Sequence, residues 1–321
     1  MIQAVLFLIG GTIALYFGAE WLVRGAGRAG AFLGVPSLVI GLTVVSLGTS
    51  APELVVSVVS AVQGRADLAL GNVLGSNLAN VGLILGLVAL IHPVEVSSPA
   101  IRRDIPLMIG VTVVLLPLLL DLELGRWDGL ILLGLLAMYL ALLARTLRKK
   151  KERGPDGAPA PGGAKAGKAG ARLLGRSAVL VVVGSAVLVL GGHGIVLGAV
   201  ALAQALEVPE LLIGLSVVAV GTSLPELAAS LVAALRGNAG IALGNVVGSN
   251  LFNLTAVLGV TALVQPLAVD PGIPGREFVA VLALSVLLVP LTGFGRRIGR
   301  RDGVLLLVAY GATWWWFVAS G

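Results

Sequence analysis

The chain has 321 residues, of which 57% are hydrophobic and only 12% charged, and its formal net charge is +6. This composition offers too little polar surface for a soluble globular protein, and several apolar runs exceed the roughly 18 residues that a helix needs to cross a bilayer. No cysteine is present, which excludes disulfides, thiolate metal sites and cysteine nucleophiles. The sequence therefore predicts an all-α integral membrane protein.

Polar residues divide the chain into ten predicted transmembrane helices, the first of which lacks the basic start and cleavage pattern of a signal peptide and is expected to be retained. The predicted spans are 2–22, 35–62, 68–90, 105–120, 128–144, 177–199, 208–235, 241–264, 278–292 and 303–320. Residues 145–176 contain a basic run followed by Gly, Pro, Ala and Lys, a composition typical of a flexible linker. The expected domains are a five-helix repeat at 1–144, this basic linker, and a second five-helix repeat at 177–321.

The basic residues orient these spans. If the linker is cytoplasmic, 19 of the 22 Lys and Arg residues lie on that side, and only Arg65, Arg126 and Arg276 lie outside. We therefore expect a multi-pass protein of the cell (inner) membrane with both termini outside. The positive charge then reflects topology and contact with anionic lipid of the bilayer, and no nucleic-acid partner is expected.

A motif in the second and third spans occurs again in the second half of the chain. Residues 48–53 read Gly-Thr-Ser-Ala-Pro-Glu and residues 71–77 read Gly-Asn-Val-Leu-Gly-Ser-Asn. Both recur 173 positions later with one change each, Leu224 in place of Ala51 and Val247 in place of Leu74. Roughly 30 of the 53 positions from 35–87 are identical in 208–260. Because each half has an odd number of spans, the second half enters the membrane from the opposite side, and the two copies form an inverted repeat.

A proline stands near the centre of the second span and of the seventh. Pro52 removes a backbone donor and disfavours helix at Ala51, so we expect these two helices to break. Broken backbone at membrane depth is tolerated where it lines a cavity, and its carbonyl groups can bind a cation. A kink used only for packing is the alternative. A glutamate follows the proline in both copies, as Glu53 and Glu226, and this favours a functional site at the centre of the fold.

The remaining polar residues of the motif recur at helical spacing. Asn72, Ser76 and Asn80 form one stripe on the third span, and the eighth span repeats it. Asn80 and Asn253 end their stripes and are expected cation ligands, whereas Asn72, Asn77, Asn245 and Asn250 are expected to satisfy broken backbone. The serines and glycines of the motif could equally serve close helix packing. Carboxylate, hydroxyl and amide oxygens suit Ca²⁺ and Na⁺, whereas a transition-metal site would include imidazole or thiolate.

Two carboxylates buried in hydrocarbon without Lys or Arg in the same spans require a cation. One Ca²⁺, two Na⁺ or two protons would each cancel their charge, so an occupied site can change its exposure from one side of the membrane to the other. The uncompensated charge of an empty site opposes this change. This asymmetry favours obligate exchange by alternating access. A channel and an intramembrane enzyme are the alternatives, and the sequence contains no H-E-x-x-H motif and no phosphate loop to support an enzyme.

The two motif copies resemble the α-repeats of the Ca²⁺/cation antiporter superfamily, the sodium/calcium exchanger group, in its short prokaryotic form. The resemblance implies a midplane site that transports Ca²⁺ and Na⁺, with mobile first and sixth helices. Asn253 stands where some members have an acidic residue, which argues against K⁺ co-transport. Leu227 stands where the cation/proton branch has histidine, which favours sodium coupling, and proton coupling or another divalent cation stays the alternative. The metal ligands that the resemblance implies are Glu53, Glu226, Thr49, Thr222, Ser50, Ser223, Ser76, Ser249, Asn80 and Asn253.

No enzymatic activity and no cofactor are expected, and the oligomeric state is left open. Two further titratable residues occupy equivalent positions of the first and sixth spans. Glu20 lies one turn before Arg24, which predicts an i,i+4 ion pair. His193 is expected to be a hydrogen-bonded structural residue, with a pH sensor as the alternative.

Overall fold

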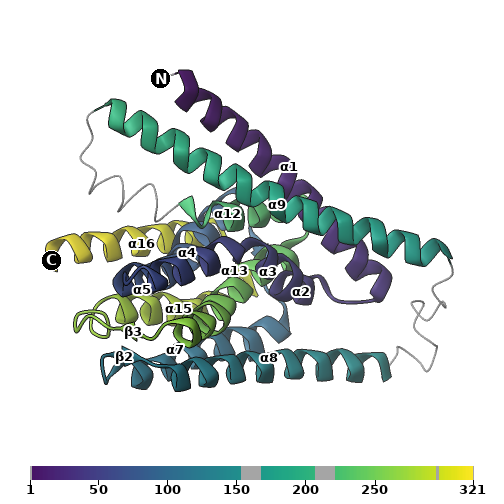
Figure 1. Cartoon of the computed structure of the whole chain (residues 1–321). Helices are drawn as coiled ribbons and strands as arrows, with labels where there is room; N and C mark the ends of the chain where they lie inside the picture. The colour runs from purple at the N-terminus through teal and green to yellow at the C-terminus, as the bar shows by residue number, and fades with distance from the viewer. Residues whose placement is uncertain (1, 153–167, 207–220, 294–295, 321) are drawn as a thin grey trace.

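The computed structural model describes residues 2–152, 168–206, 221–293 and 296–320 (Figure 1). Helices dominate these residues, and four short strands join some of the loops. Labels with η mark π-helical turns. The elements are α1 (Ile2–Leu33), α2 (Ser37–Ile40), η1 (Gly41–Val45), α3 (Ser46–Thr49), α4 (Ala51–Val62), α5 (Ala66–Leu78), η2 (Ala79–Ile84), α6 (Leu85–Ile91), β1 (Val94–Glu95), η3 (Ala100–Asp104), α7 (Ile105–Leu119), β2 (Glu123–Leu124), α8 (Arg126–Glu152), α9 (Lys168–Ala205), α12 (Leu224–Leu235), α13 (Ala239–Phe252), η6 (Asn253–Val257), α14 (Leu258–Val264), β3 (Leu267–Ala268), α15 (Glu277–Gly293), β4 (Arg297–Ile298) and α16 (Arg300–Ser320).

The long apolar helices have the size and composition of membrane spans. Among the described residues, five helices are long and apolar enough to cross a bilayer, or six if the bent pair at 37–62 counts as one span. Large apolar side chains on α1, α8 and α16 are exposed, as expected of surfaces that face lipid. Residues 208–220 of the seventh predicted span lie outside the described part of the chain, so the count of ten crossings stays a prediction.

Helix extends into both ends of the predicted linker at 145–176. Helix α8 continues to Glu152 and helix α9 begins at Lys168. Arginine, lysine and leucine, which make up most of both ends, are strong helix formers, and this explains the extension. The middle of the linker, 153–167, lies outside the described residues.

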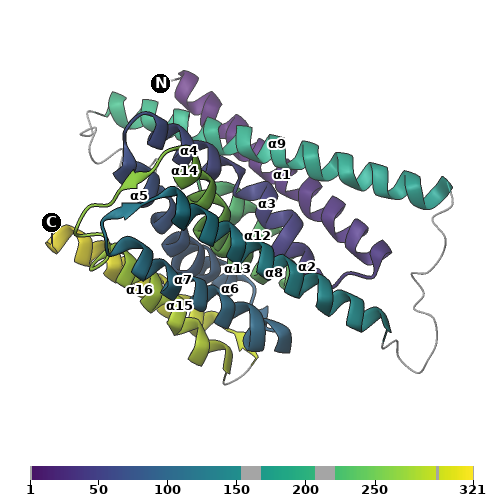
Figure 2. The same ribbon diagram turned by 60° about the horizontal axis from the view of Figure 1, so that its bottom comes forward.

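Helices α1 and α9 lie side by side along one side of the molecule, and the other helices gather into a bundle beside them (Figures 1 and 2). They run antiparallel, because Gly11 of α1 meets Gly191 of α9 and Gly18 meets Gly184. The two backbones touch at these positions: a Cβ atom on Gly11 would lie 2.7 Å from the carbonyl oxygen of Gly191. Glycine is therefore required here for close packing of the helices.

The ion pair predicted between Glu20 and Arg24 is confirmed, with 2.5 Å between Arg24 Nη2 and Glu20 Oε1. Glu20 also forms an ion pair with Arg236, which follows α12, and this second contact ties α1 to the bundle. The prediction of a hydrogen-bonded His193 was wrong. Its side chain is exposed, and it makes no hydrogen bond within the described residues, because α9 turns this position away from the bundle.

The two halves of the chain repeat the same elements. The bounds of α4 and α12 differ by the same 173 residues that separate the sequence motifs, and so do those of α6 and α14. Strand β1 pairs antiparallel with β4, and β2 with β3, so each strand pair joins one half to the other.

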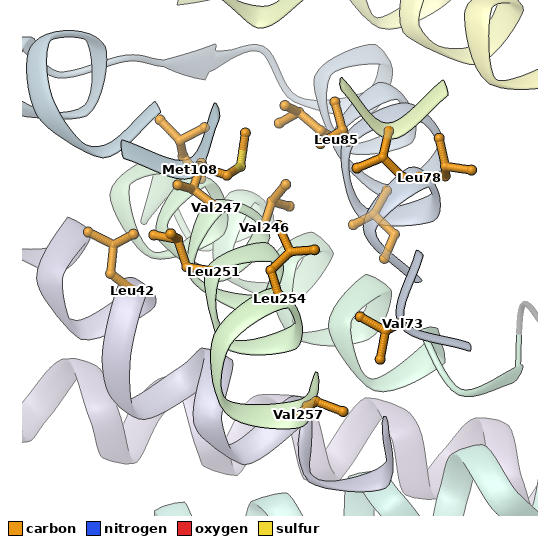
Figure 3. Close-up of a cluster of buried hydrophobic side chains, with 14 of the residues drawn as sticks. Leu42, Val73, Leu78, Leu85, Met108, Val246, Val247, Leu251, Leu254 and Val257 are labelled. Carbon is orange, nitrogen blue, oxygen red and sulfur yellow. The ribbon is translucent and has the colours of Figure 1, made fainter. Parts of the chain in front are cut away.

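The apolar core lies around α13, which is the most buried of the long helices. Leu251 of α13, Leu42 of η1 and Met108 of α7 belong to this cluster, in which side chains from both halves meet (Figure 3). The described parts of the second, third and eighth predicted spans therefore converge at the centre of the molecule, where the repeated motif lies.

Candidate cation site

The two prolines of the motif stand at the start of helices, and the backbone leaves helical geometry just before them. Ser50 has φ −82° and ψ 7°, and its counterpart Ser223 has φ −89° and ψ 3°. In the first half, the segment 37–49 and helix α4 meet at an angle of 44°. The bend lies one residue earlier than the predicted break at Ala51, because the first turn of a helix tolerates Pro52 and helix α4 can begin at Ala51.

Glu53 and Glu226 lie in the first turns of α4 and α12 and are fully buried. Their carboxyl groups are close enough to repel each other electrostatically. The positive end of each helix dipole partly offsets the negative charge. Two carboxylates from opposite halves of the chain thus occupy one buried region.

The Glu226 carboxylate accepts hydrogen bonds from both halves. Ser50 Oγ donates to Glu226 Oε1 over 3.0 Å, and Ser249 Oγ lies 3.5 Å from the same oxygen. The spacing of the motif predicts that Ser50 shares a helix face with Glu53. The turn at Ser50 instead directs its hydroxyl group across to the glutamate of the other half.

The equivalent bonds around Glu53 are not formed. By repeat symmetry, Ser223 and Ser76 should donate to Glu53, yet their hydroxyl groups and both of its carboxylate oxygens have no hydrogen-bond partner among the described residues. All of these atoms are buried, and buried polar atoms are normally paired. The predicted site residues contribute the following unpartnered atoms within the described structure: Glu53 Oε1 and Oε2, Ser76 Oγ, Asn80 Oδ1, Ser223 Oγ, Glu226 Oε2, and Asn253 Oδ1 and Nδ2.

Asn72 and Asn245, on the neighbouring helices, donate hydrogen bonds to the backbone of the glutamates. Asn72 Nδ2 lies 3.3 Å from the backbone oxygen of Glu53, and Asn245 Nδ2 lies 3.3 Å from that of Glu226. Their carbonyl oxygens accept hydrogen bonds from the other half, Asn245 from Thr49 at 3.1 Å and Asn72 from Thr222 at 3.4 Å. Both amides bond to backbone beside the break, as the sequence predicts, and the contacts with the threonines are additional.

Asn80 and Asn253 lie in the π-helical turns η2 and η6. Asn80 Nδ2 donates to Asn250 Oδ1 over 2.9 Å, and Asn250 Nδ2 lies 3.4 Å from the backbone oxygen of Asn77. These contacts link the third and eighth predicted spans across the repeat. Single π-helical turns are frequent at functional sites, and nothing in the sequence pattern indicates them.

The arrangement offers only hard oxygen ligands and two negative charges. Among the described residues, no group of three or more His, Cys, Asp or Glu side chains could hold a metal ion. A cation would therefore rely on Glu53 and Glu226 together with neutral oxygens. Hydroxyl and amide oxygens around two carboxylates suit Ca²⁺ or Na⁺.

The chain is similar in sequence to known ion exchangers. A family model described as "Sodium/calcium exchanger protein" matches residues 3–145 and 176–319. The sodium/calcium exchanger MaX1 of Methanosarcina acetivorans is 32% identical, and the match covers 95% of each chain. The inner membrane protein YrbG of Escherichia coli is 37% identical, over 95% of this chain and 94% of YrbG.

The fold is similar to a solved exchanger structure. The sodium-calcium exchanger NCX_Mj, in crystals soaked with 10 mM Na⁺ and zero Ca²⁺, superposes with a TM-score of 0.82 at 31% identity. The match covers 96% of this chain and 97% of that one. The similarity therefore extends over both halves of the chain.

Proposed function

The chain belongs to the sodium/calcium exchanger protein family, and from this premise we propose that it is a secondary antiporter that exchanges Ca²⁺ for Na⁺ across the membrane. The observation that carries the proposal is the pair of fully buried carboxylates, Glu53 and Glu226, set among buried oxygens that no described residue satisfies. Family members are transporters, and no catalytic activity is proposed.

The two carboxylates explain why transport would be an exchange. Together they carry two negative charges at fully buried positions, and moving uncompensated charge through hydrocarbon is costly. One Ca²⁺ or two Na⁺ would neutralise the site and let it change its exposure from one side to the other. The empty site would resist this change, so that each ion would leave only when another replaces it.

The proposed ligands come from both halves of the chain. Ca²⁺ takes about six to eight oxygen ligands, and the motif residues supply enough buried oxygens for this number. The proposed ligands are Glu53, Glu226, Thr49, Thr222, Ser50, Ser223, Ser76, Ser249, Asn80 and Asn253. Alternating access would arise from movement of α1 and α9, which lie together beside the bundle, relative to the helices that hold these residues (Figure 2).

Uptake of Ca²⁺ into proteoliposomes tests the proposal. Vesicles loaded with Na⁺ should accumulate Ca²⁺ when diluted into Na⁺-free medium, and vesicles loaded with K⁺ at neutral pH should not. Glu53→Gln and Glu226→Gln should each reduce uptake at subsaturating Ca²⁺ by at least about 10- to 100-fold, the loss that is typical when only a partner of a metal ligand is removed. Glu123→Gln, in the exposed β2 loop, is the matched control and should transport normally.

Other outcomes point to other functions. Uptake driven by a proton gradient in the absence of Na⁺ would support the proton-coupled alternative, and transport of a different divalent cation in preference to Ca²⁺ would support the second alternative. Ca²⁺ flux that needs no counter-ion on the opposite side would indicate a channel. Full Na⁺-driven uptake by both glutamine variants would contradict the proposed site.

A further inference from the structure

Asn245 connects three parts of the site through one side chain. It projects from α13 and is fully buried. Its Nδ2 atom lies 3.3 Å from the backbone oxygen of Glu226 and 2.9 Å from Ser230 Oγ, both on α12. Its Oδ1 atom accepts a hydrogen bond of 3.1 Å from Thr49 Oγ1, which belongs to the other half of the chain.

These contacts fix the orientation of the amide. An asparagine side chain can be turned by 180°, which exchanges its nitrogen and oxygen, and the orientation follows from its partners. The backbone oxygen of Glu226 can only accept a hydrogen bond, so the atom that faces it must be the nitrogen. The amide oxygen of Asn245 therefore faces Thr49.

The direction of the threonine hydrogen matters for a cation. A hydroxyl group has one hydrogen and two lone pairs, and a cation is coordinated by a lone pair. The oxygen of Thr49 lies 3.1 Å from Asn245 Oδ1 and 3.3 Å from the backbone oxygen of Ser46, so the amide oxygen of Asn245 is the nearer of these two acceptors for the hydrogen. When the hydrogen points to Asn245, a lone pair of Thr49 stays available for a cation.

Asn72 of the first half repeats the arrangement of Asn245. Asn72 Nδ2 lies 3.3 Å from the backbone oxygen of Glu53 and 3.0 Å from Ser57 Oγ, and its Oδ1 atom lies 3.4 Å from Thr222 Oγ1. The donor atom thus contacts the glutamate helix of its own half, and the acceptor atom contacts the threonine of the other half. Helix packing alone does not require that the donor and the acceptor of one amide contact different halves. Through these contacts, each asparagine links the threonine of one half to the glutamate of the other half.

We infer that Asn245 and Asn72 are positioning residues of the cation site, which hold the hydroxyl hydrogens of Thr49 and Thr222 away from the ion without coordinating it. The inference rests on the proposed function, because it takes the two threonines to be ion ligands. Positioning groups of this kind usually affect metal affinity by about 10- to 100-fold. The asparagines should therefore influence the affinity for Ca²⁺ much more than the maximal rate.

A double-mutant cycle tests this inference. Asn245→Leu removes both functions of the amide, Thr49→Val removes the hydroxyl group with little change of shape, and the double variant combines them. The midpoint of the Ca²⁺-induced rise in melting temperature of the purified full chain reports binding, and KM and maximal rate come from proteoliposome uptake. Each single change should weaken Ca²⁺ binding about tenfold, and the double change should weaken it no further, because both act through the same ligand, the Thr49 hydroxyl group.

Controls separate positioning from general damage to the fold. Ser230→Ala removes one partner of Asn245 but leaves the bond with Thr49. This variant should bind Ca²⁺ within about threefold of the parent protein. If Asn245→Leu does not fold, the cycle of Asn72→Leu with Thr222→Val makes the same test at the half-buried position.

The outcomes distinguish this inference from the proposed function. Independent losses that multiply in the double variant, or a loss of maximal rate without a change in KM, would overturn the positioning role while Ca²⁺ binding by the parent protein still supports the exchanger. Failure of the parent protein itself to bind Ca²⁺ or to take it up would instead overturn the proposed function.

Discussion

Among the residues of the site, Asn253 and Asn80 occupy equivalent positions but have different surroundings. Asn80 donates a hydrogen bond to Asn250. Both side-chain polar atoms of Asn253 are buried without a hydrogen-bond partner in the described structure. An aspartate at 253 would therefore lose no hydrogen bond seen here. An aspartate at 80 would lose the Nδ2 donor and place a carboxylate oxygen against Asn250 Oδ1.

This difference predicts different results for two matched variants. Asn253→Asp should lower the melting temperature in cation-free buffer, because it adds a third buried carboxylate without a basic partner. The same charge should lower the Ca²⁺ concentration for half of the thermal shift by about tenfold, equivalent to ~1.4 kcal/mol. Asn80→Asp should be less stable than Asn253→Asp in both buffers. Thermal unfolding with chelator and with Ca²⁺ measures these effects, and an Asn253→Asp midpoint equal to that of the parent would contradict the proposed ligand role.

The positions of the two glutamates could be predicted from sequence, but their hydrogen-bond partners could not. A carboxylate after proline in an apolar span, found twice, is a strong signal because burying charge is costly. Ser50 was expected beside Glu53 because helical spacing assumes a continuous helix. The backbone of Ser50 at ψ 7° sends the side chain to Glu226 instead, and no local pattern encodes that dihedral angle.

Helices α1 and α9 pack closely against each other, and glycines occur along their contact every seven residues. Gly11 and Gly18 of α1 face α9, and Gly184 and Gly191 of α9 face α1. Gly10 is adjacent to Gly11 in sequence but points elsewhere: no atom of the described residues lies within 4 Å of a Cβ atom placed on it. The chain thus offers two neighbouring glycines, one inside the helix contact and one outside it.

Replacing each of these glycines by alanine should give changes of opposite sign. Alanine favours helix over glycine by about 1 kcal/mol, so Gly10→Ala should be neutral or stabilising. In Gly11→Ala the new methyl group would lie 2.7 Å from the Gly191 oxygen and 2.8 Å from the Ile195 nitrogen, and these backbone atoms can yield only if the helices separate. Overpacking of this kind costs about 1–3 kcal/mol. Thermal unfolding of both variants in detergent measures the difference, and equal stability would show that α1 and α9 do not pack this closely.

The helices themselves were more predictable than their irregular turns. Apolar length predicts the helices of the described residues that are long enough to cross a membrane, and Pro52 predicts the bend in the first half to within one residue. The π-helical turns η2 and η6, which hold Asn80 and Asn253, have no sequence signal, because they depend on how neighbouring helices pack. The role of the motif glycines also depends on packing. Gly244 and Gly248 contact η1. Gly71 and Gly75 are their counterparts in the first half, and the segment equivalent to η1 falls within 207–220, outside the described residues.

For the whole molecule, the strand pairs agree with the topology inferred from charge. Strand β1 pairs with β4, and the charge distribution places both in cytoplasmic loops. Strand β2 pairs with β3, and both belong to loops expected outside. The start of α8 and the C-terminus lie at one end of the molecule, while the end of α8 and the start of α9, which flank the linker, lie at the other (Figure 1). Loops that contact each other cannot lie on opposite sides of a membrane, so each pairing agrees with a topology that puts both of its strands on one side.

An inverted repeat makes a sharp prediction for Ser97 and Asp270, which are 173 residues apart and therefore equivalent in the two halves. Both are exposed in loops, and the native chain has no cysteine, so single cysteines can be introduced at either place. Asp270→Cys should react in intact cells with a maleimide that cannot cross membranes, and Ser97→Cys should react only after the membrane is made permeable. Asp121→Cys, at the other end of α7 from Ser97, should behave like Asp270→Cys. Reaction of Ser97→Cys and Asp270→Cys from the same side would mean that the repeats are parallel, and the two glutamates could not then approach a shared site from opposite directions.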